Sequence, residues 1–79
     1  MTNEIKRARI IQALNETERM LEKAEKRYNE TLACIKMDEA EGLRVSLDWL
    51  NYCHSDKKRI DQLKAHIIKL NNMLAEIAA

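Results

Sequence analysis

Apolar residues recur every three or four positions through the second half of the sequence, and only one charged residue, Asp56, interrupts them. Positions three and four apart lie on one face of an α-helix, so this spacing predicts a long amphipathic helix. A face of this length needs a matching apolar surface to cover it. The stripe consists of Val45, Trp49, Tyr52, Asp56, Ile60, Leu63, Ile67, Leu70, Leu74 and Ile77.

The first half of the sequence carries a second stripe with helical spacing. Its members are Ile10, Leu14, Thr17, Leu21, Ala24, Tyr28, Thr31, Leu32 and Ile35. Thr17, Ala24 and Thr31 are small residues at intervals of seven, which lets two helix backbones approach closely. If the chain reverses near its middle, the stripes meet at positions whose numbers add to about 80. We therefore predict an all-α fold, a long antiparallel helical hairpin that resembles a coiled coil.

The reversal is predicted at residues 37–42. The segment Asp38-Glu39-Ala40-Glu41 has the capping-box pattern, in which an acidic residue caps a helix and a glutamate three positions later reaches back. An alternative makes Gly42 the C-cap of the first helix. In the first interpretation Asp38 starts the second helix. Both interpretations put the reversal between residues 37 and 43, and we predict a single domain, 1–79, with a helix at 3–36, a turn at 37–42 and a helix at 43–78.

The weakest part of the second predicted helix is the segment 51–56. One helix could end before Ser55, which would then cap a third helix. We favour a continuous or kinked helix, because the apolar stripe keeps its phase through the segment. A buried lone carboxylate is costly, so Asp56 is expected to reach solvent or a lysine such as Lys23 or Lys57.

The composition is that of long helices. The sequence of 79 residues has no proline and one glycine, and 34% of its residues are charged, which is typical of helical coiled coils. Two helices bury little apolar surface for a chain of this length. We therefore expect the core to be completed by homodimerisation into a four-helix bundle, or by a different protein partner.

Charge and cysteine content bear on partners and location. The formal net charge of +1 gives no strong field to attract nucleic acid. Two cysteines are too few for a disulfide framework, and the first residues contain no apolar signal segment. No apolar run is long enough to span a membrane. The expectation is a soluble cytoplasmic protein with no membrane partner.

A further stripe lies on another side of the second predicted helix, where nothing in a two-helix hairpin covers it. Its members are Leu43, Leu47, Leu50, His54, Lys57, Asp61, Ala65, Ile68, Asn72 and Ala75. The stripe could serve self-association, or it could dock a different protein, and both interpretations stay open. The candidate partner-binding residues are Leu43, Leu47, Leu50, Trp49, His54 and Ile68.

Residue types used in catalysis and metal binding are present, but their spacing does not suit that chemistry. His54, Ser55 and Asp56 are consecutive, so on a helix they point in different directions, whereas the members of a catalytic triad converge. Cys34 and Cys53 lack the paired spacing of zinc ligands. No glycine-rich loop offers a phosphate cradle. We predict no enzymatic activity, no catalytic residue, no metal and no cofactor.

These expectations favour a non-enzymatic interaction protein that binds and occludes a surface on a larger protein complex. Small helical proteins without cofactors are often regulators or inhibitors. Phage and other mobile elements encode many of them, including anti-CRISPR and other anti-defence proteins. Because this chain is of similar size, we expect such an origin for it.

The alternative is a protein that binds nucleic acid. Basic side chains on the faces of a helical-hairpin dimer could recognise RNA or DNA by shape. In architecture such a dimer resembles the Rop-type regulators of plasmid copy number, with no residues aligned between the two. The candidate residues for this function are Lys57, Lys58, Arg59, Lys64, Lys6, Arg7 and Arg9.

Overall fold

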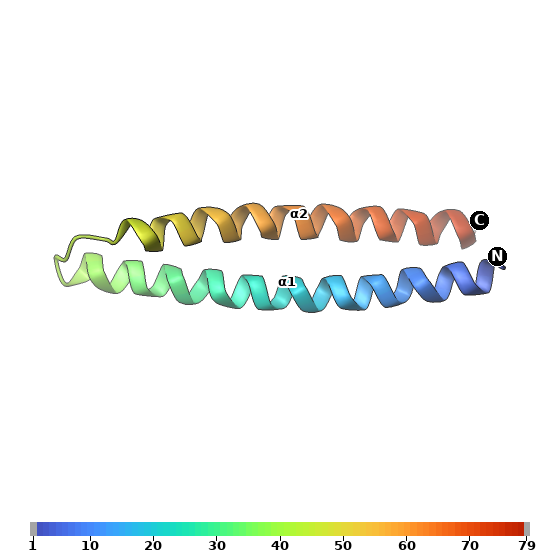
Figure 1. Ribbon diagram of the computed structural model, residues 1–79, viewed down its shortest axis with the longest axis horizontal. Helices are drawn as coiled ribbons and strands as arrows, with labels where there is room; N and C mark the ends of the chain where they lie inside the picture. The colour runs from blue at the N-terminus through green and yellow to red at the C-terminus, as the bar shows by residue number, and fades with distance from the viewer. Residues whose placement is uncertain (1, 79) are drawn as a thin grey trace.

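The computed structural model describes residues 2–78 and consists of two antiparallel helices (Figure 1). Helix α1 spans Asn3–Ala40 and helix α2 spans Leu47–Ala78. They lie side by side in a rod measuring 60 × 16 × 14 Å, and both ends of the chain lie at the end opposite the turn (Figure 1). The prediction of an all-α antiparallel hairpin is confirmed.

Helix α1 begins with a side-chain cap. The hydroxyl of Thr2 accepts a hydrogen bond from the backbone N–H of Ile5 (3.3 Å), which satisfies one of the donors that the first turn leaves free. Glu4 places a negative charge in the first turn, where the positive end of the helix dipole favours it. No proline or glycine occurs between residues 3 and 40, so the backbone has no intrinsic breaking point.

Gly42 ends α1 in a left-handed backbone conformation, with a φ angle of +71°. Its N–H donates to the carbonyl of Glu39 (3.1 Å), and the N–H of Leu43 donates to the carbonyl of Asp38 (2.8 Å). This pair of bonds is the Schellman motif, which satisfies the last carbonyl groups of a helix. The prediction that Asp38 starts the second helix is therefore wrong, and the alternative with Gly42 at the end of α1 is correct.

We expect Gly42→Ala to lower the free energy of unfolding by about 1 kcal/mol, because a Cβ is disfavoured at positive φ. No atom beyond its chain neighbours lies within 4 Å of the position that a Cβ would occupy, so the effect comes from the backbone. Gly42→Asn is the matched control, since asparagine adopts this conformation more readily. Urea denaturation at one chain concentration measures both variants. Equal losses for alanine and asparagine would contradict the explanation.

Helix α2 begins at Leu47, four residues later than predicted, and Ser46 caps it. The hydroxyl of Ser46 accepts from the N–H of Asp48 (3.2 Å), and its carbonyl accepts from the N–H of Leu50 (3.3 Å). The linker between the helices therefore occupies residues 41–46. Because Gly42 ends α1, and Asp38 does not start a new helix, both boundaries move toward the C-terminus.

Helix α2 is continuous from its first residue to its last. The segment 51–56 is helical throughout, so the alternative with three helices is wrong. The helix continues because its apolar stripe keeps the same phase before and after this segment. A break in the helix would have moved the apolar residues that follow it away from the seam.

The core lies along the seam between the helices. The buried residues of α1 all belong to the predicted stripe, and they are Ile10, Leu14, Thr17, Ala24, Thr31 and Ile35. The buried residues of α2 are Asp56, Ile60 and Leu70. Near the chain termini the side chains of Ile10, Leu14 and Leu70 form one cluster, around which pack Ala13, Ile67, Leu74 and Ile77.

The two buried threonines satisfy their hydroxyl groups within α1. Thr17 Oγ1 donates to the carbonyl of Ala13 (2.7 Å), and Thr31 Oγ1 donates to the carbonyl of Arg27 (2.9 Å). Neither hydroxyl needs a partner on α2, so these small side chains can face the seam without the cost of an unpaired polar group.

Contacts across the seam lie near the predicted register. Leu70 clusters with Ile10, as predicted, and also with Leu14. Arg27 and Asp56 form an ion pair across the seam, and their numbers add to 83 rather than to 80.

The first turns of α2 are open. Trp49 and Tyr52, both expected at the seam, are 36% and 55% exposed, and Tyr52 lines a hollow with Thr31. Val45 lies in the linker and not in the helix. The prediction that the layers match along nearly the whole hairpin is therefore wrong at the turn end.

Candidate interaction surfaces

Three leucines are exposed near the turn. Leu47 is 70% exposed, Leu43 is 56% exposed and Leu50 is 48% exposed. Leu47 and Leu50 are one turn apart on α2, and with residues 44–46 they line a surface hollow of about 490 Å³. Leu43 lies in the linker, outside that hollow. We call Leu47 and Leu50 the leucine face.

Of the other predicted partner-binding residues, His54 is nearest to the leucine face. It is exposed one turn after Leu50 on the same side of α2, but it does not line the hollow. Ile68, on the same side and 62% exposed, is about 27 Å from Leu50 along the helix at 1.5 Å per residue. Trp49 lines a different hollow. Of the predicted residues, Leu47 and Leu50 share the hollow near the turn.

The hollow beside Trp49 was missed by sequence reasoning. The rings of Trp49 and Tyr52 meet edge to face, with centroids 6.4 Å apart and an interplanar angle of 72°. The hollow has a volume of about 450 Å³ and is lined by Arg27, Glu30, Thr31, Cys34, Trp49 and Tyr52. Trp49 and Tyr52 are three residues apart, so the sequence indicates that they are neighbours on a helix. The sequence does not show that Thr31 and Cys34 of α1 lie beside them, because this depends on how the two helices are aligned.

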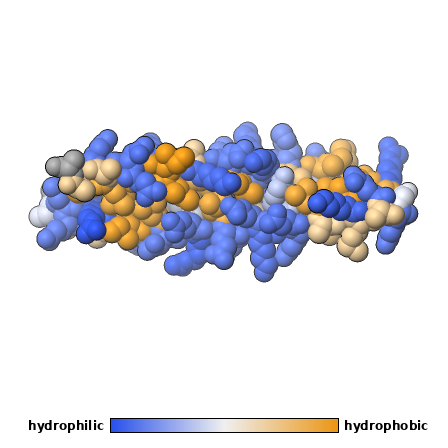
Figure 2. All heavy atoms as spheres, turned by 180° about the vertical axis from the view of Figure 1, so that it is seen from behind, coloured by the Kyte–Doolittle hydropathy of each residue, from blue (hydrophilic) through white to orange (hydrophobic). Residues whose placement is uncertain are grey.

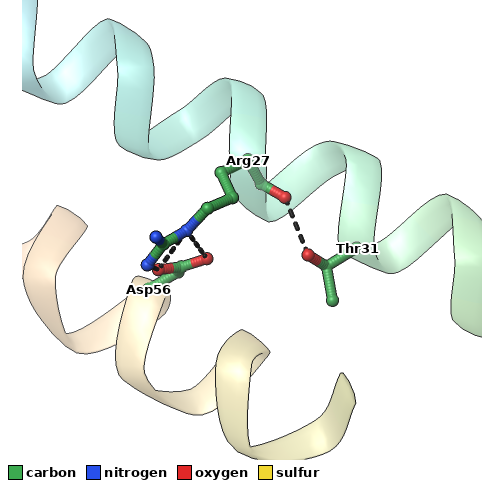
Figure 3. Close-up of polar contacts among 3 residues, drawn as sticks. All are labelled: Arg27, Thr31 and Asp56. Atoms are coloured by element: carbon green, nitrogen blue, oxygen red, sulfur yellow. Dashed lines mark hydrogen bonds and ion pairs between the residues drawn. The ribbon is translucent and has the colours of Figure 1, made fainter. Parts of the chain in front are cut away.

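An ion pair between the exposed Arg27 and the buried Asp56 crosses the seam in the middle of the hairpin (Figure 3). Asp56 is 1% exposed, and its two carboxylate oxygens accept hydrogen bonds from Arg27 Nε at 3.1 and 3.0 Å. A terminal nitrogen of the same guanidinium donates to one of these oxygens. These hydrogen bonds hold the pKa of Asp56 below its usual value of 3.8, against the opposite effect of burial, and they raise the pKa of Arg27.

The expectation that Asp56 reaches solvent or a lysine is therefore wrong. Lys57 binds Asp61 on the exposed surface instead, with 3.1 Å between Nζ and Oδ1. The observed register places Arg27 beside Asp56, and a planar guanidinium can reach both carboxylate oxygens, whereas an ammonium group is a single point charge. An acidic residue within an apolar stripe indicates that a basic residue of the opposite helix pairs with it. The stripe alone does not indicate which basic residue that is.

Apolar groups on one face of the rod gather in two regions, one toward the chain termini and one toward the turn, with mostly hydrophilic groups between them (Figure 2). Among residues 2–78, most exposed large apolar residues are divided in the same way. Near the turn they are Met37, Leu43, Leu47, Trp49, Leu50 and Tyr52; nearer the termini they are Ile5, Ile11, Ile68 and Met73, and Met20 lies between the two groups. Contiguous exposed apolar groups mark sites of interaction.

The chain matches no protein-family model, no curated protein and no solved structure. Its function is therefore inferred from its own side chains.

Within residues 2–78, no three His, Cys, Asp or Glu side chains are grouped so that they could hold a metal ion. Helices α1 and α2, as far as they are described, lack an apolar segment sufficient to cross a membrane. Both cysteines are free and half-buried.

The basic residues predicted for nucleic-acid binding are exposed on several sides of the rod. They are Lys6, Arg7, Arg9, Lys57, Lys58, Arg59 and Lys64. Residues 57–59 are consecutive, and successive side chains on a helix point about 100° apart. Asp61 forms an ion pair with Lys57. Glu76 lines the same hollow as Lys6 and Arg9. Basic groups thus share these surfaces with acidic groups.

Proposed function

We propose that the protein is a non-enzymatic interaction protein that binds and occludes a surface on a larger protein complex. The observation that carries the proposal is the exposure of the leucine face beside a hollow of about 490 Å³. Fully burying a leucine side chain contributes about 1.5–3 kcal/mol, so Leu47 and Leu50 are the anchors expected in an interface.

The shape of the hairpin supports an occluding role. A rod 60 Å long and two helices thick covers an extended strip of a partner with a small chain. The leucine face belongs to a capped, continuous helix, so it is held rigidly. Inhibition or regulation would follow from occupancy alone. The proposed site of action is the cytoplasm, and the proposed source is a phage or other mobile element.

We expect Leu47→Asp to weaken capture of the partner by at least about tenfold without changing the helix content. Leu47 is exposed in the hairpin, so a carboxylate is tolerated there, but it would lose its water inside an interface. Met20→Asp is the matched control, because Met20 is 48% exposed on α1. Tagged wild type and both variants are compared in pull-downs from a nuclease-treated bacterial lysate, with captured proteins identified by mass spectrometry and helix content measured by circular dichroism.

A stoichiometric protein complex that is lost only with Leu47→Asp is the expected result. Equal capture by all three forms would show that the leucine face is not the binding surface. In a parallel experiment without nuclease, capture of nucleic acid and of no stoichiometric protein would replace this proposal with binding through the basic residues.

A further inference from the structure

The side of α2 that faces away from α1 carries a stripe at helical spacing. We call it the outer stripe, and all of its members are exposed: Leu47, Leu50, His54, Lys57, Asp61, Ala65, Ile68, Asn72 and Ala75. At about 100° per residue they fall within an arc of about 80°, which is as narrow as the seam of a coiled coil. Its largest apolar side chains are near the two ends, and two opposite charges occupy its centre.

Two residue pairs of the outer stripe are complementary when its direction is reversed. Leu50 and Ile68 are equally distant from position 59, and so are Lys57 and Asp61. If two copies of α2 lie antiparallel and cross at this position, Leu50 of each copy meets Ile68 of the other. Lys57 of each copy likewise meets Asp61 of the other, so opposite charges are paired on both sides of the two-fold axis.

Parallel pairing of the same stripes is disfavoured by charge. Each residue would then lie beside its own copy, which places two lysines together at position 57 and two aspartates together at position 61. The side chains of Lys57 and Asp61 are 55% and 60% exposed, so both are accessible to a second chain. The charges at the centre of the outer stripe therefore select the antiparallel orientation.

The hairpin exposes more surface than a compact protein of its mass. Its accessible area is 6359 Å², whereas a folded monomer of 9.3 kDa is expected to expose about 5,000 Å², and the excess follows from the elongated shape. One partner buries roughly 800 Å² in a standard interface. The outer stripe extends for about 42 Å from Leu47 to Ala75, which is enough for a long helix-to-helix contact.

We propose that α2 packs antiparallel against α2 of a second copy, which gives a two-fold symmetric dimer with the α2 helices in the centre and the α1 helices outside. The proposal does not rest on the proposed function. Because the dimer covers Leu47 and Leu50, binding of a target complex through the leucine face requires the dimer to dissociate. The charged centre and the Ile68 end of the outer stripe belong to the dimer alone.

Sedimentation equilibrium of the full chain at micromolar concentration tests the dimer by charge reversal. The wild type is expected to be dimeric, and Lys57→Asp is expected to raise the dissociation constant about tenfold, because two attractive contacts become repulsive. Adding Asp61→Lys to Lys57→Asp restores opposite charges and is expected to restore the dimer. Lys26→Asp makes the same change in charge on α1 and is expected to leave the mass unchanged. A monomeric wild type, or equal effects of Lys57→Asp and Lys26→Asp, would overturn the proposal.

Disulfide trapping tests the orientation. Leu50→Cys and Ile68→Cys are made separately in a chain whose Cys34 and Cys53 are replaced by serine. Both new cysteines are on the surface, so the hairpin should fold in each case. Oxidation of the mixed chains is expected to give a covalent heterodimer, because antiparallel pairing brings these positions together. Crosslinking of Leu50→Cys to itself, with none between the two variants, would show parallel pairing and overturn the proposal.

The dimer and the proposed function can fail separately. The mass in solution is measured without any target, whereas capture is measured with one. A monomeric wild type that still captures a protein through Leu47 would overturn the dimer and leave the proposed function standing. A dimer that the charge reversal dissociates, in a chain that captures no protein, would support the dimer and remove the proposed function.

Discussion

Arg27→Met is expected to destabilise the hairpin strongly at neutral pH. The substitution leaves Asp56, which is 1% exposed, without its hydrogen-bonded cation, while the charge of Arg59 remains nearby. A buried acceptor that loses its donors costs about 1–3 kcal/mol. A chain of 79 residues has a total stability of about 4–12 kcal/mol, so a large share would be lost. Urea unfolding followed by circular dichroism at one chain concentration measures the loss.

Two further variants locate the cause of this loss. Arg19→Met removes an exposed arginine from α1 and is expected to change the stability by less than about 0.5 kcal/mol. Arg27→Met combined with Asp56→Leu is expected to recover most of the stability, because apolar residues of similar size often replace a buried ion pair without loss. A double variant as unstable as Arg27→Met alone would show that the unpaired carboxylate is not the cause.

The ion pair also fixes the sign of a pH dependence. Arg27 lowers the pKa of Asp56 in the folded state, so the pair stabilises the protein above the ordinary value of 3.8. That stabilisation is lost as the pH falls through the lowered pKa. In Arg27→Met, burial without the hydrogen-bonded cation raises the pKa of Asp56, so protonation of Asp56 relieves the cost. The stability difference between wild type and Arg27→Met should therefore shrink from about pH 7 to about pH 4, and a constant difference would speak against the pair.

Leu70→Ala is the second substitution with a large expected effect. Leu70 is 6% exposed and packs between α1 residues Ile10 and Leu14, so its truncation removes apolar contacts from both helices and leaves a cavity. A buried leucine replaced by alanine costs about 2–5 kcal/mol, and we expect about 3 kcal/mol here. Urea unfolding under the same conditions measures the change.

Met37→Ala is the control for Leu70→Ala, because it also shortens an apolar side chain but at a position that is 63% exposed. Its effect on the free energy of unfolding is expected to be under about 0.5 kcal/mol. If both substitutions had the same small effect, the cluster around Leu70 would not be the core of the hairpin.

The core could be predicted from the sequence because helical periodicity is a strong signal over this length. The two stripes account for all of the buried apolar residues in the described part of the chain. These are Ile10, Leu14, Ala24 and Ile35 on α1 and Ile60 and Leu70 on α2. The phase of the second stripe also indicated a continuous second helix, which the structure confirms.

The turn could not be predicted securely because two local signals compete within five residues. Asp38 and Glu41 match a capping box, while Gly42 can adopt the left-handed conformation that ends a helix. The glycine prevails, because its conformation lets the N–H groups of residues 42 and 43 bond the last carbonyls of α1. This local outcome sets the register, and the register decides that Arg27 is the partner of Asp56.

Both ends of the described chain, Thr2 and Ala78, lie at the same end of the rod, and the linker lies at the other. The hairpin can therefore be grafted into a surface loop of an unrelated host protein, because the chain would enter and leave at one place. The graft would project as an arm about 60 Å long, with Leu47 and Leu50 near its tip. A scaffold of this kind could present the leucine face at a chosen distance from a second binding domain, and so increase its effective concentration at a tethered target.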